Sequence, residues 1–328
     1  MIDYEFKTGK NFNFIDGFGE KFNVPVFGDL LAIPDDLGDG YIKHINLGEG
    51  FKVVTHNYIL KEDFVMRRRG PDLSNDLVSI LFYLSEPTTT NVINQQKKKT
   101  YFSNKESSIQ LASHELQSDT YFEKDSHIYF IALAISKERL INLLELSDAN
   151  NVVNTILHSE KPFFYQEKTT TEIRQVLKYV IESHEQNTLK KLYFRIKITE
   201  LLYLLFTQLL KRGNAEESII NNEDVDAMMQ IRKQILVDLD VPPKLNQLSE
   251  QFGISKTKMK RLFKQMYGNS IYSYYQHYRI EKAAFLLKHM NTSVTETAHQ
   301  LGFSNISHFG RLFKQQYGTT PKNYSSVS

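Results

Sequence analysis

The 328-residue sequence contains no cysteine. Disulfides, thiolate zinc sites, iron-sulfur clusters and cysteine nucleophiles are therefore excluded. The first twelve residues mix acidic and basic side chains with apolar ones, unlike the basic and then apolar profile of a secretion signal. The densest apolar stretch, residues 201–206, is too short to span a bilayer. We expect a cytoplasmic protein without a membrane partner.

The motifs of common enzymes are missing as well. There is no Walker loop, no H-E-x-x-H and no G-x-S-x-G. Residues 255–258 match S-x-x-K, but the partner motifs of that nucleophile are absent. Three G-x-G pairs, at residues 17–19, 38–40 and 48–50, lack a third glycine at the required spacing, which indicates turns rather than phosphate loops. We expect no catalytic residue.

The histidines are not spaced like metal ligands, because no H-x-H pair occurs anywhere. We interpret the scattered histidines of the N-terminal region as ordinary packed or surface side chains: His44, His56, His114 and His127. The sequence therefore predicts no metal site and no cofactor.

Charge is distributed unevenly along the chain. Residues 241–328 carry 12 Lys and Arg against three acidic residues, a net charge of +9, whereas residues 1–240 carry 28 basic and 35 acidic residues, a net charge of −7. Such a basic segment attracts a polyanion, and this asymmetry is typical of contact with nucleic acid. A solvated basic surface explains the charge alone equally well.

The N-terminal region predicts strands. Up to about residue 135, runs of branched and aromatic residues alternate with turns, as at residues 51–60, 77–84 and 127–135. Many short strands indicate a sandwich or a barrel. We place the basic runs at residues 67–69 and 97–99 in solvated loops, and an anionic ligand near residues 67–69 is the alternative.

From residue 137 the pattern becomes helical. Residues 172–183 place apolar side chains on one helix face, and residues 189–210 form a strongly apolar helix. This second helix must be covered, either by the strand region or by its twin in a homodimer, and we favour dimerisation. Residues 213–222 are polar and typical of a linker, so a domain boundary is expected there.

The basic C-terminal region contains a duplication. Arg-Leu-Phe-Lys-Gln at residues 261–265 recurs at residues 311–315, a shift of fifty, and the Tyr-Gly pair that follows recurs at the same shift. Upstream, residues 252–255 match residues 301–304 at a shift of forty-nine. One residue has therefore been inserted between the two matching blocks.

Each copy predicts a helix-turn-helix. A short amphipathic helix, residues 245–252 or 294–301, meets a glycine that suits a left-handed helix end. Ser255 or Ser304 then serves as the N-cap of a second helix, which ends at the Tyr-Gly pair. In such motifs the second helix lies in the DNA major groove and its early residues meet base edges.

The second helices carry side chains that suit DNA. Arginine donates two hydrogen bonds to guanine, so Arg261 and Arg311 are predicted to read bases, while lysines more often serve phosphates. A structural role, in which each arginine pins its own helix, is the alternative. The first of these helices offers Lys256, Thr257, Lys258, Lys260, Arg261 and Lys264.

Residues 271–288 predict a single connecting helix, about 27 Å long, because apolar residues recur there at i, i+3, i+4 and i+7. A rigid connector of this length suits two recognition helices in successive major-groove segments, about 34 Å apart.

Taken together, these motifs resemble the AraC/XylS family of bacterial transcriptional regulators over about residues 224–324. The matching positions are Gly253, Ile254, Ser255, Arg261, Phe263, Tyr274, Arg279, Ala283, Leu286, Leu287, Gly302, Phe303, Ser304, His308, Phe309, Arg311, Phe313, Lys314, Gly318, Thr319, Thr320, Pro321 and Tyr324. The chain departs from the family pattern at Ile271, Gly310 and Ser325.

The resemblance implies two helix-turn-helix units that bind double-stranded promoter DNA. It also implies that the protein activates transcription and has RNA polymerase as a further partner. The base-facing residues it implies are Thr257, Lys260 and Arg261 in the first unit and Ile306, Ser307, His308 and Arg311 in the second; Asn305 and Lys314 complete the predicted DNA-binding set. Arg279 is interpreted as a structural arginine.

The N-terminal region resembles the cupin-like effector domain of such regulators and, with residues 189–210, the siderophore-responsive members. We therefore predict an α+β multidomain protein. Its parts are a β-rich effector domain (residues 1–164), a helical dimerisation segment (165–213), a linker (214–223) and an all-α DNA-binding domain with two helix-turn-helix units joined by a long helix (224–328). The effector is either a small molecule or a protein partner, and no ligand-binding residue is identified.

Overall fold

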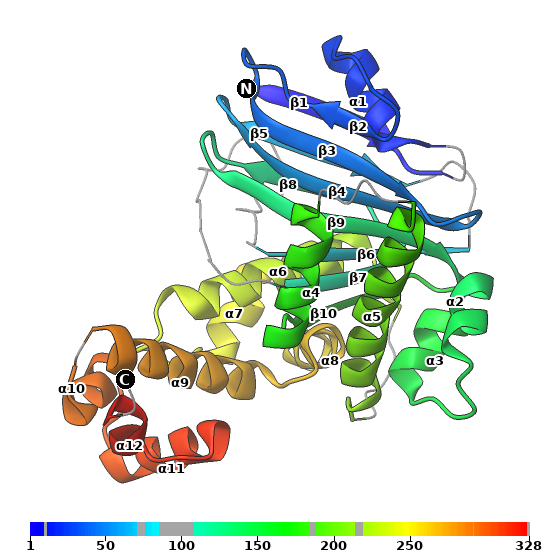
Figure 1. Ribbon diagram of the computed structural model, residues 1–328. Helices are drawn as coiled ribbons and strands as arrows, with labels where there is room; N and C mark the ends of the chain where they lie inside the picture. Colours follow the sequence, from blue (N-terminus) through cyan, green and yellow to red (C-terminus); the bar gives the residue numbers. More distant parts are fainter. Residues whose placement is uncertain are drawn as a thin grey trace. The chain divides into compact units, whose positions relative to one another are not determined.

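The structure, a computed structural model, describes residues 1–9, 12–70, 76–84, 108–183, 188–213, 219–290 and 292–326. It divides into two compact units, Met1–Asn222 and Glu223–Ser328 (Figure 1). The prediction of a β-rich N-terminal part and a helical C-terminal part is confirmed. Within the described ranges, no helix has the length and apolar character needed to cross a membrane.

The first unit is built on two sheets with helices. Its strands are β1 (Ile2–Lys7), β2 (Leu30–Ala32), β3 (Gly38–Asn46), β4 (Phe51–Leu60), β5 (Phe64–Arg69), β6 (Leu77–Tyr83), β7 (Ser108–Ser113), β8 (Ser118–Phe122), β9 (His127–Ser136) and β10 (Phe164–Lys168). Its helices are α1 (Phe14–Phe22), α2 (Lys137–Leu144), α3 (Asn151–His158), α4 (Thr171–Glu182) and α5 (Lys190–Leu210). The smaller sheet has the order β1-β5-β8, and the larger has the order β10-β7-β6-β9-β4-β3-β2.

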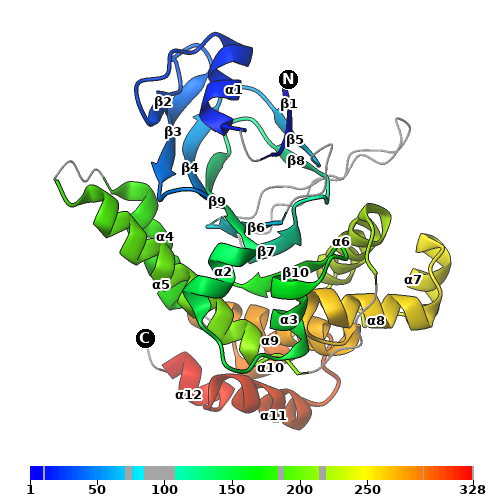
Figure 2. The same ribbon diagram turned by 90° about the vertical axis from the view of Figure 1, so that its right-hand side faces the viewer.

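The larger sheet buries side chains on both faces. On β4, Val53 belongs to a core shared with α4 and α5, whereas Val54 and Tyr58 belong to a core shared with α1 and the smaller sheet. This alternation follows from the two-residue period of a strand. Helices α4 and α5 run side by side along the first of these faces (Figure 2). The strand region therefore covers the inner face of α5, which was one of the two predicted alternatives.

Two of the three predicted glycine turns are wrong. Residues 17–19 lie inside α1, where Asn13 caps the helix by accepting a hydrogen bond from the Ile15 amide, and Phe18 is buried. Residues 38–40 begin β3, because its backbone approaches β4 so closely that a Cβ at Gly38 would lie 2.0 Å from the Ile59 carbonyl oxygen. Burial and close strand approach thus outweigh local turn preference. Residues 48–50 do form the turn between β3 and β4.

The basic run at residues 67–69 is not a solvated loop, as predicted, but the end of β5. Its side chains are partly buried, because they pair with the flanking strands and with Ser79 of the larger sheet. The run at residues 97–99, and residues 214–218 of the predicted linker, lie outside the described residues.

The second unit is helical throughout its described length. Its helices are α6 (Asn222–Val237), α7 (Leu245–Phe252), α8 (Lys256–Tyr267), α9 (Ile271–His289), α10 (Val294–Gln300), α11 (Ile306–Tyr317) and α12 (Pro321–Ser326). The predicted connecting helix is confirmed as α9, which packs against α8 and against α10, α11 and α12 (Figure 1).

Candidate nucleic-acid interface

The first helix-turn-helix consists of α7 and α8. Gly253 ends α7 in the left-handed conformation with φ of 64°, which glycine adopts without strain. Ser255 then caps α8, because its hydroxyl accepts a hydrogen bond of 3.3 Å from the Lys258 amide. Both predicted end signals of this unit are confirmed.

The second helix-turn-helix consists of α10 and α11. Ser293 and Glu296 form a reciprocal capping box at the start of α10. Gly302 follows this helix with φ of +71°, and a Cβ there would lie 2.1 Å from the Asp240 carbonyl oxygen. Only glycine therefore fits between α10 and the segment that follows α6.

The N-cap of α11 is Asn305, so the prediction of Ser304 for this role is wrong. The Asn305 side chain accepts a hydrogen bond of 3.0 Å from the His308 amide. Asn305 is fifty residues after Ser255, so the turn absorbs the residue inserted between the two repeats. As a result Arg261 and Arg311 each lie six residues after their cap and occupy the same helical position.

Helix α8 separates apolar from basic side chains. Met259, Leu262, Phe263 and Met266 are buried in the unit's core, as their helical spacing predicts. The exposed residues of the predicted DNA-binding set on this helix are Lys256, Thr257, Lys260, Arg261 and Lys264. Arg261 has no hydrogen-bond or ion-pair partner among the described residues, so its five donors face water.

Two lysines of α8 have partners within the unit. The Lys258 ammonium lies 2.7 Å from Oδ1 of Asp224, which is buried at the start of α6. The Lys256 ammonium donates to the Asn246 side chain on α7 at 3.0 Å. Asp224 and Asn246 have no motif that marks them, because only the packing of α6 and α7 beside α8 brings them near.

Helix α11 shows the same division with less charge. Phe309 and Phe313 are buried, and Ile306, Ser307, Arg311 and Lys314 are exposed. His308 is half-buried with its ring near that of Phe303. Gly310 lies in open space, so α11 carries no side chain where α8 carries Lys260.

Arg279 on α9 is a structural residue, as predicted. It is 3% exposed, and its Nε and Nη2 both donate to the Leu301 carbonyl oxygen at the end of α10. Its guanidinium lies 3.7 Å from the centre of the Phe303 ring, and burial lowers its pKa. Arg279 therefore ties the second helix-turn-helix to the connector.

A second arginine, which sequence reasoning missed, ties α6 to the same connector. The Arg232 Nε donates to the Tyr274 hydroxyl at 2.6 Å, and Tyr274 donates to the Tyr278 hydroxyl at 3.1 Å. The Tyr274 ring packs edge-on against Phe263 of α8. These contacts hold α6, α8 and α9 in one geometry.

Within the described part of the chain, no group of three or more His, Asp or Glu side chains is arranged to hold a metal ion. His56 and His114, two of the scattered histidines, are buried in the first unit.

Sequence comparisons agree with this architecture. A family model described as "Helix-turn-helix domain" matches residues 248–326. A second, described as "Regulatory protein PchR N-terminal domain", matches residues 38–219, more than half of the chain. This chain belongs to the AraC/XylS family of transcriptional regulators.

Individual relatives share parts of this AraC/XylS chain. The HTH-type transcriptional activator RhaS of Escherichia coli is 26% identical over 153 residues, 46% of this chain and 52% of the relative. The chain thus spans about half the length of the curated relatives it matches.

Two solved structures are among those that match parts of the chain. A probable AraC family transcriptional regulator from Rhodopseudomonas palustris has 27% identity and a TM-score of 0.29, covering 30% of this chain and 94% of its own. Apo ToxT from Vibrio cholerae has 15% identity and a TM-score of 0.32, covering 85% of this chain and 97% of its own.

Proposed function

We propose that this AraC/XylS family member binds double-stranded promoter DNA sequence-specifically and activates transcription, with RNA polymerase as a further partner and without enzymatic activity. The observation that carries the proposal is the matched position of Arg261 and Arg311, each exposed six residues after the cap of its helix. Two equivalent helices that present a bidentate donor at one position suit the reading of two similar DNA boxes.

The predicted set divides by role. Thr257, Lys260 and Arg261 on α8, and Ile306, Ser307 and Arg311 on α11, face solvent near the helix starts and suit base edges. Lys264 and Lys314 lie further along and suit phosphates. Lys256 and Lys258 reach DNA only by exchanging their protein partners, while the Asn305 side chain serves its cap.

We also propose a homodimer that forms through residues 165–213. With its inner face buried, α5 still exposes Leu192, Ile196 and Tyr203 at 49%, 55% and 66% of their surface. These residues are spaced by four and seven along the helix and therefore share one face. Apolar exposure of this extent on one helix suits a second copy of the same helix.

The first unit is proposed to be the cupin-like part that receives the signal, either a small molecule or a protein partner, in the cytoplasm. Its two sheets enclose a core of their own, separate from the core under α4 and α5. A separate core lets the two sheets respond to a signal while the core under α4 and α5 keeps its packing.

The test is a selection of randomised duplex DNA by the purified full-length protein at moderate salt. Enrichment of two boxes about one helical turn apart is the expected result, because two major-groove helices on one connector require it. Retention that depends on salt but enriches no sequence would leave only electrostatic binding and would contradict specific recognition.

A further inference from the structure

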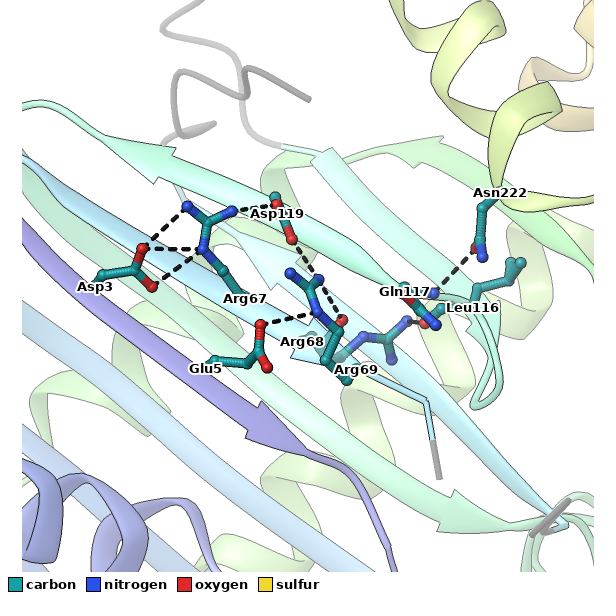
Figure 3. A network of polar contacts seen from close by, with 9 residues as sticks. All are labelled: Asp3, Glu5, Arg67, Arg68, Arg69, Leu116, Gln117, Asp119 and Asn222. Atoms are coloured by element: carbon teal, nitrogen blue, oxygen red, sulfur yellow. Dashed lines mark hydrogen bonds and ion pairs between the residues drawn. The ribbon is translucent and has the colours of Figure 1, made fainter. Parts of the chain in front are cut away.

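The three consecutive arginines of β5 divide between the two faces of their strand (Figure 3). Arg67 pairs with Asp3 and Asp119, and Arg69 pairs with Glu5 and Asp119, all on the flanking strands β1 and β8. Arg68 lies between them and points the opposite way, as the two-residue period of a strand requires. The two outer arginines are thus neutralised by carboxylates, and the inner one faces the interior of the unit.

Arg68 is a half-buried arginine with a fully buried Nε and no carboxylate partner among the described residues. Its Nη1 donates to the Ser79 hydroxyl at 2.9 Å, and its Nη2 donates to the Leu116 carbonyl oxygen. Its Nε has no hydrogen-bond partner, and no acidic side chain pairs with it anywhere in the described ranges. A buried charge is costly unless an opposite charge accompanies it. No carboxylate of the described residues therefore balances the charge of Arg68.

His114 shares the Ser79 hydroxyl with Arg68, and Lys52 lies further along the same row of the larger sheet. The Nδ1 of His114 lies 2.7 Å from the Ser79 hydroxyl, the same oxygen that Arg68 contacts, and its buried Nε2 has no partner among the described atoms. Lys52 is half-buried and donates to the carbonyl oxygens of Gly9 and Phe12. Burial, with smaller contributions from the positive charges of Arg68 and Lys52, lowers the pKa of His114 to about 3.

The strand register places Ala134 between Ser79 and Lys52. Ser79 on β6 pairs with Ala112 on one side and with Ala134 on the other, and Ala134 pairs in turn with Lys52. Directly paired residues share one face of a sheet, and strands lie about 4.8 Å apart, so Ser79 and Lys52 are about 10 Å apart along this row. Ala134 and the nearby Ala132 remain half-exposed, so solvent reaches the row.

We propose that this cluster binds the carboxylate of a small organic anion. The planar guanidinium of Arg68 suits a carboxylate in two-point contact, and its unpaired Nε supplies a donor for it. His114 donates a further hydrogen bond from Nε2, and Lys52 supplies charge from the other end of the row. The body of the anion lies over Ala132 and Ala134. This inference rests on the proposed function only in taking the anion as the signal of the first unit.

The test uses full-length protein and two probes of the same shape. Benzoate carries a flat apolar body and a carboxylate, and benzamide replaces that carboxylate with a neutral amide. Calorimetric melting temperatures are recorded against each probe at constant pH and ionic strength. We expect benzoate to raise the melting temperature of the wild-type chain by roughly 3 to 6 °C at ten times its Kd, and benzamide to leave it unchanged. Equal shifts with both probes, or no shift with either, would overturn the proposal.

Variants locate the site. Arg68→Gln removes the guanidinium and should abolish the benzoate shift, whereas Arg67→Gln, on the opposite face of the same strand, should keep it. Ala132→Leu adds bulk where the body of the anion is proposed to lie and leaves Arg68 in place, so it should abolish the shift even if Arg68→Gln does not fold. Retention of the full shift in Ala132→Leu would place the benzoate elsewhere and contradict the assignment.

The DNA selection on the same preparation separates the two proposals. A benzoate shift without sequence-specific DNA binding would leave the anion site standing and overturn the proposed function. Sequence-specific DNA binding without a benzoate shift would overturn the anion site alone.

Discussion

The Arg279 guanidinium donates from two of its nitrogens to the single carbonyl oxygen of Leu301, so the middle of α9 is bonded to the end of α10. The carbonyl at a helix end has no partner within its own helix, and Arg279 supplies one. This contact sets the angle at which the second helix-turn-helix leaves the connector.

Arg279→Met should therefore destabilise the protein by about 2 to 3 kcal/mol, since the charged donor is removed and the Leu301 carbonyl oxygen is left without its partner. Calorimetry of the full-length chain measures the change. Binding to a site with two boxes should fall more than binding to a site with one. A variant as stable as the wild type would show that Phe303 and the surrounding core hold α10 without the arginine.

Arg261→Ala and Arg311→Ala should each weaken specific DNA binding by about 1 to 3 kcal/mol and relax base preference at one position. Lys264→Ala is the matched control. Loss of a phosphate contact weakens binding to all DNA sequences alike and lowers the salt slope by about 1. Gel-shift titrations at several salt concentrations distinguish these results. Unchanged binding by Arg261→Ala would contradict its placement in the groove.

Asn305→Ala should cost about 0.5 to 2 kcal/mol of stability, because the His308 amide loses its acceptor at the start of α11. Ser304→Ala, one residue earlier, should cost much less, since no capping hydrogen bond depends on that hydroxyl. Thermal unfolding of the two variants gives the comparison. A larger loss of stability in Ser304→Ala than in Asn305→Ala would identify Ser304 as the cap.

Asp224→Asn should strengthen nonspecific DNA binding, because Lys258 is released from its ion pair and becomes available to phosphates. The salt dependence of binding should steepen by about one phosphate contact. Glu223→Gln removes the same charge from the exposed neighbouring position and serves as the control. Equal effects from both variants would attribute the change to net charge rather than to Lys258.

His56 should make the first unit sensitive to acid. It is fully buried against the Phe130 ring, and burial lowers its pKa to about 3. Below about pH 6.5, His56 binds a proton in the unfolded chain but not in the folded chain. The free energy of unfolding therefore falls by up to about 1.4 kcal/mol per pH unit as the pH drops toward 3. His56→Phe should remove the share of this loss that His56 contributes and leave that of His114, whose pKa is also lowered to about 3, whereas His158→Gln at an exposed position should change neither. Denaturant titrations between pH 7 and 4 measure both.

Much of the second unit could be predicted from sequence because its signals are local. The caps at Ser255 and Gly253, and the apolar period of α9, involve residues within a few positions of one another. The duplication indicates the same two units independently of packing. The sequence does not reveal the cap of α11, because the repeat match at a shift of forty-nine aligns Ser304 with Ser255. The actual cap, Asn305, lies fifty residues after Ser255.

In the first unit, prediction failed where distant strands decide the outcome. Residues 67–69 are a solvated run by composition, yet β1 and β8 pair with Arg67 and Arg69 while the strand turns Arg68 inward. The helix at residues 14–22 contains two glycines and forms because its phenylalanines bury against the smaller sheet. Neither result follows from neighbouring residues alone.

The sequence by itself determined the two helix-turn-helix units, their basic faces and the family, because helix caps, apolar period and net charge act over short distances along the chain. Only the tertiary structure decided which charges remain free. Lys258 meets Asp224 from a helix 34 positions away in the sequence, and Arg68 becomes a half-buried cation without a carboxylate partner because the pleat of β5 turns it away from the acids beside it. Both outcomes depend on long-range packing, which the order of residues does not display.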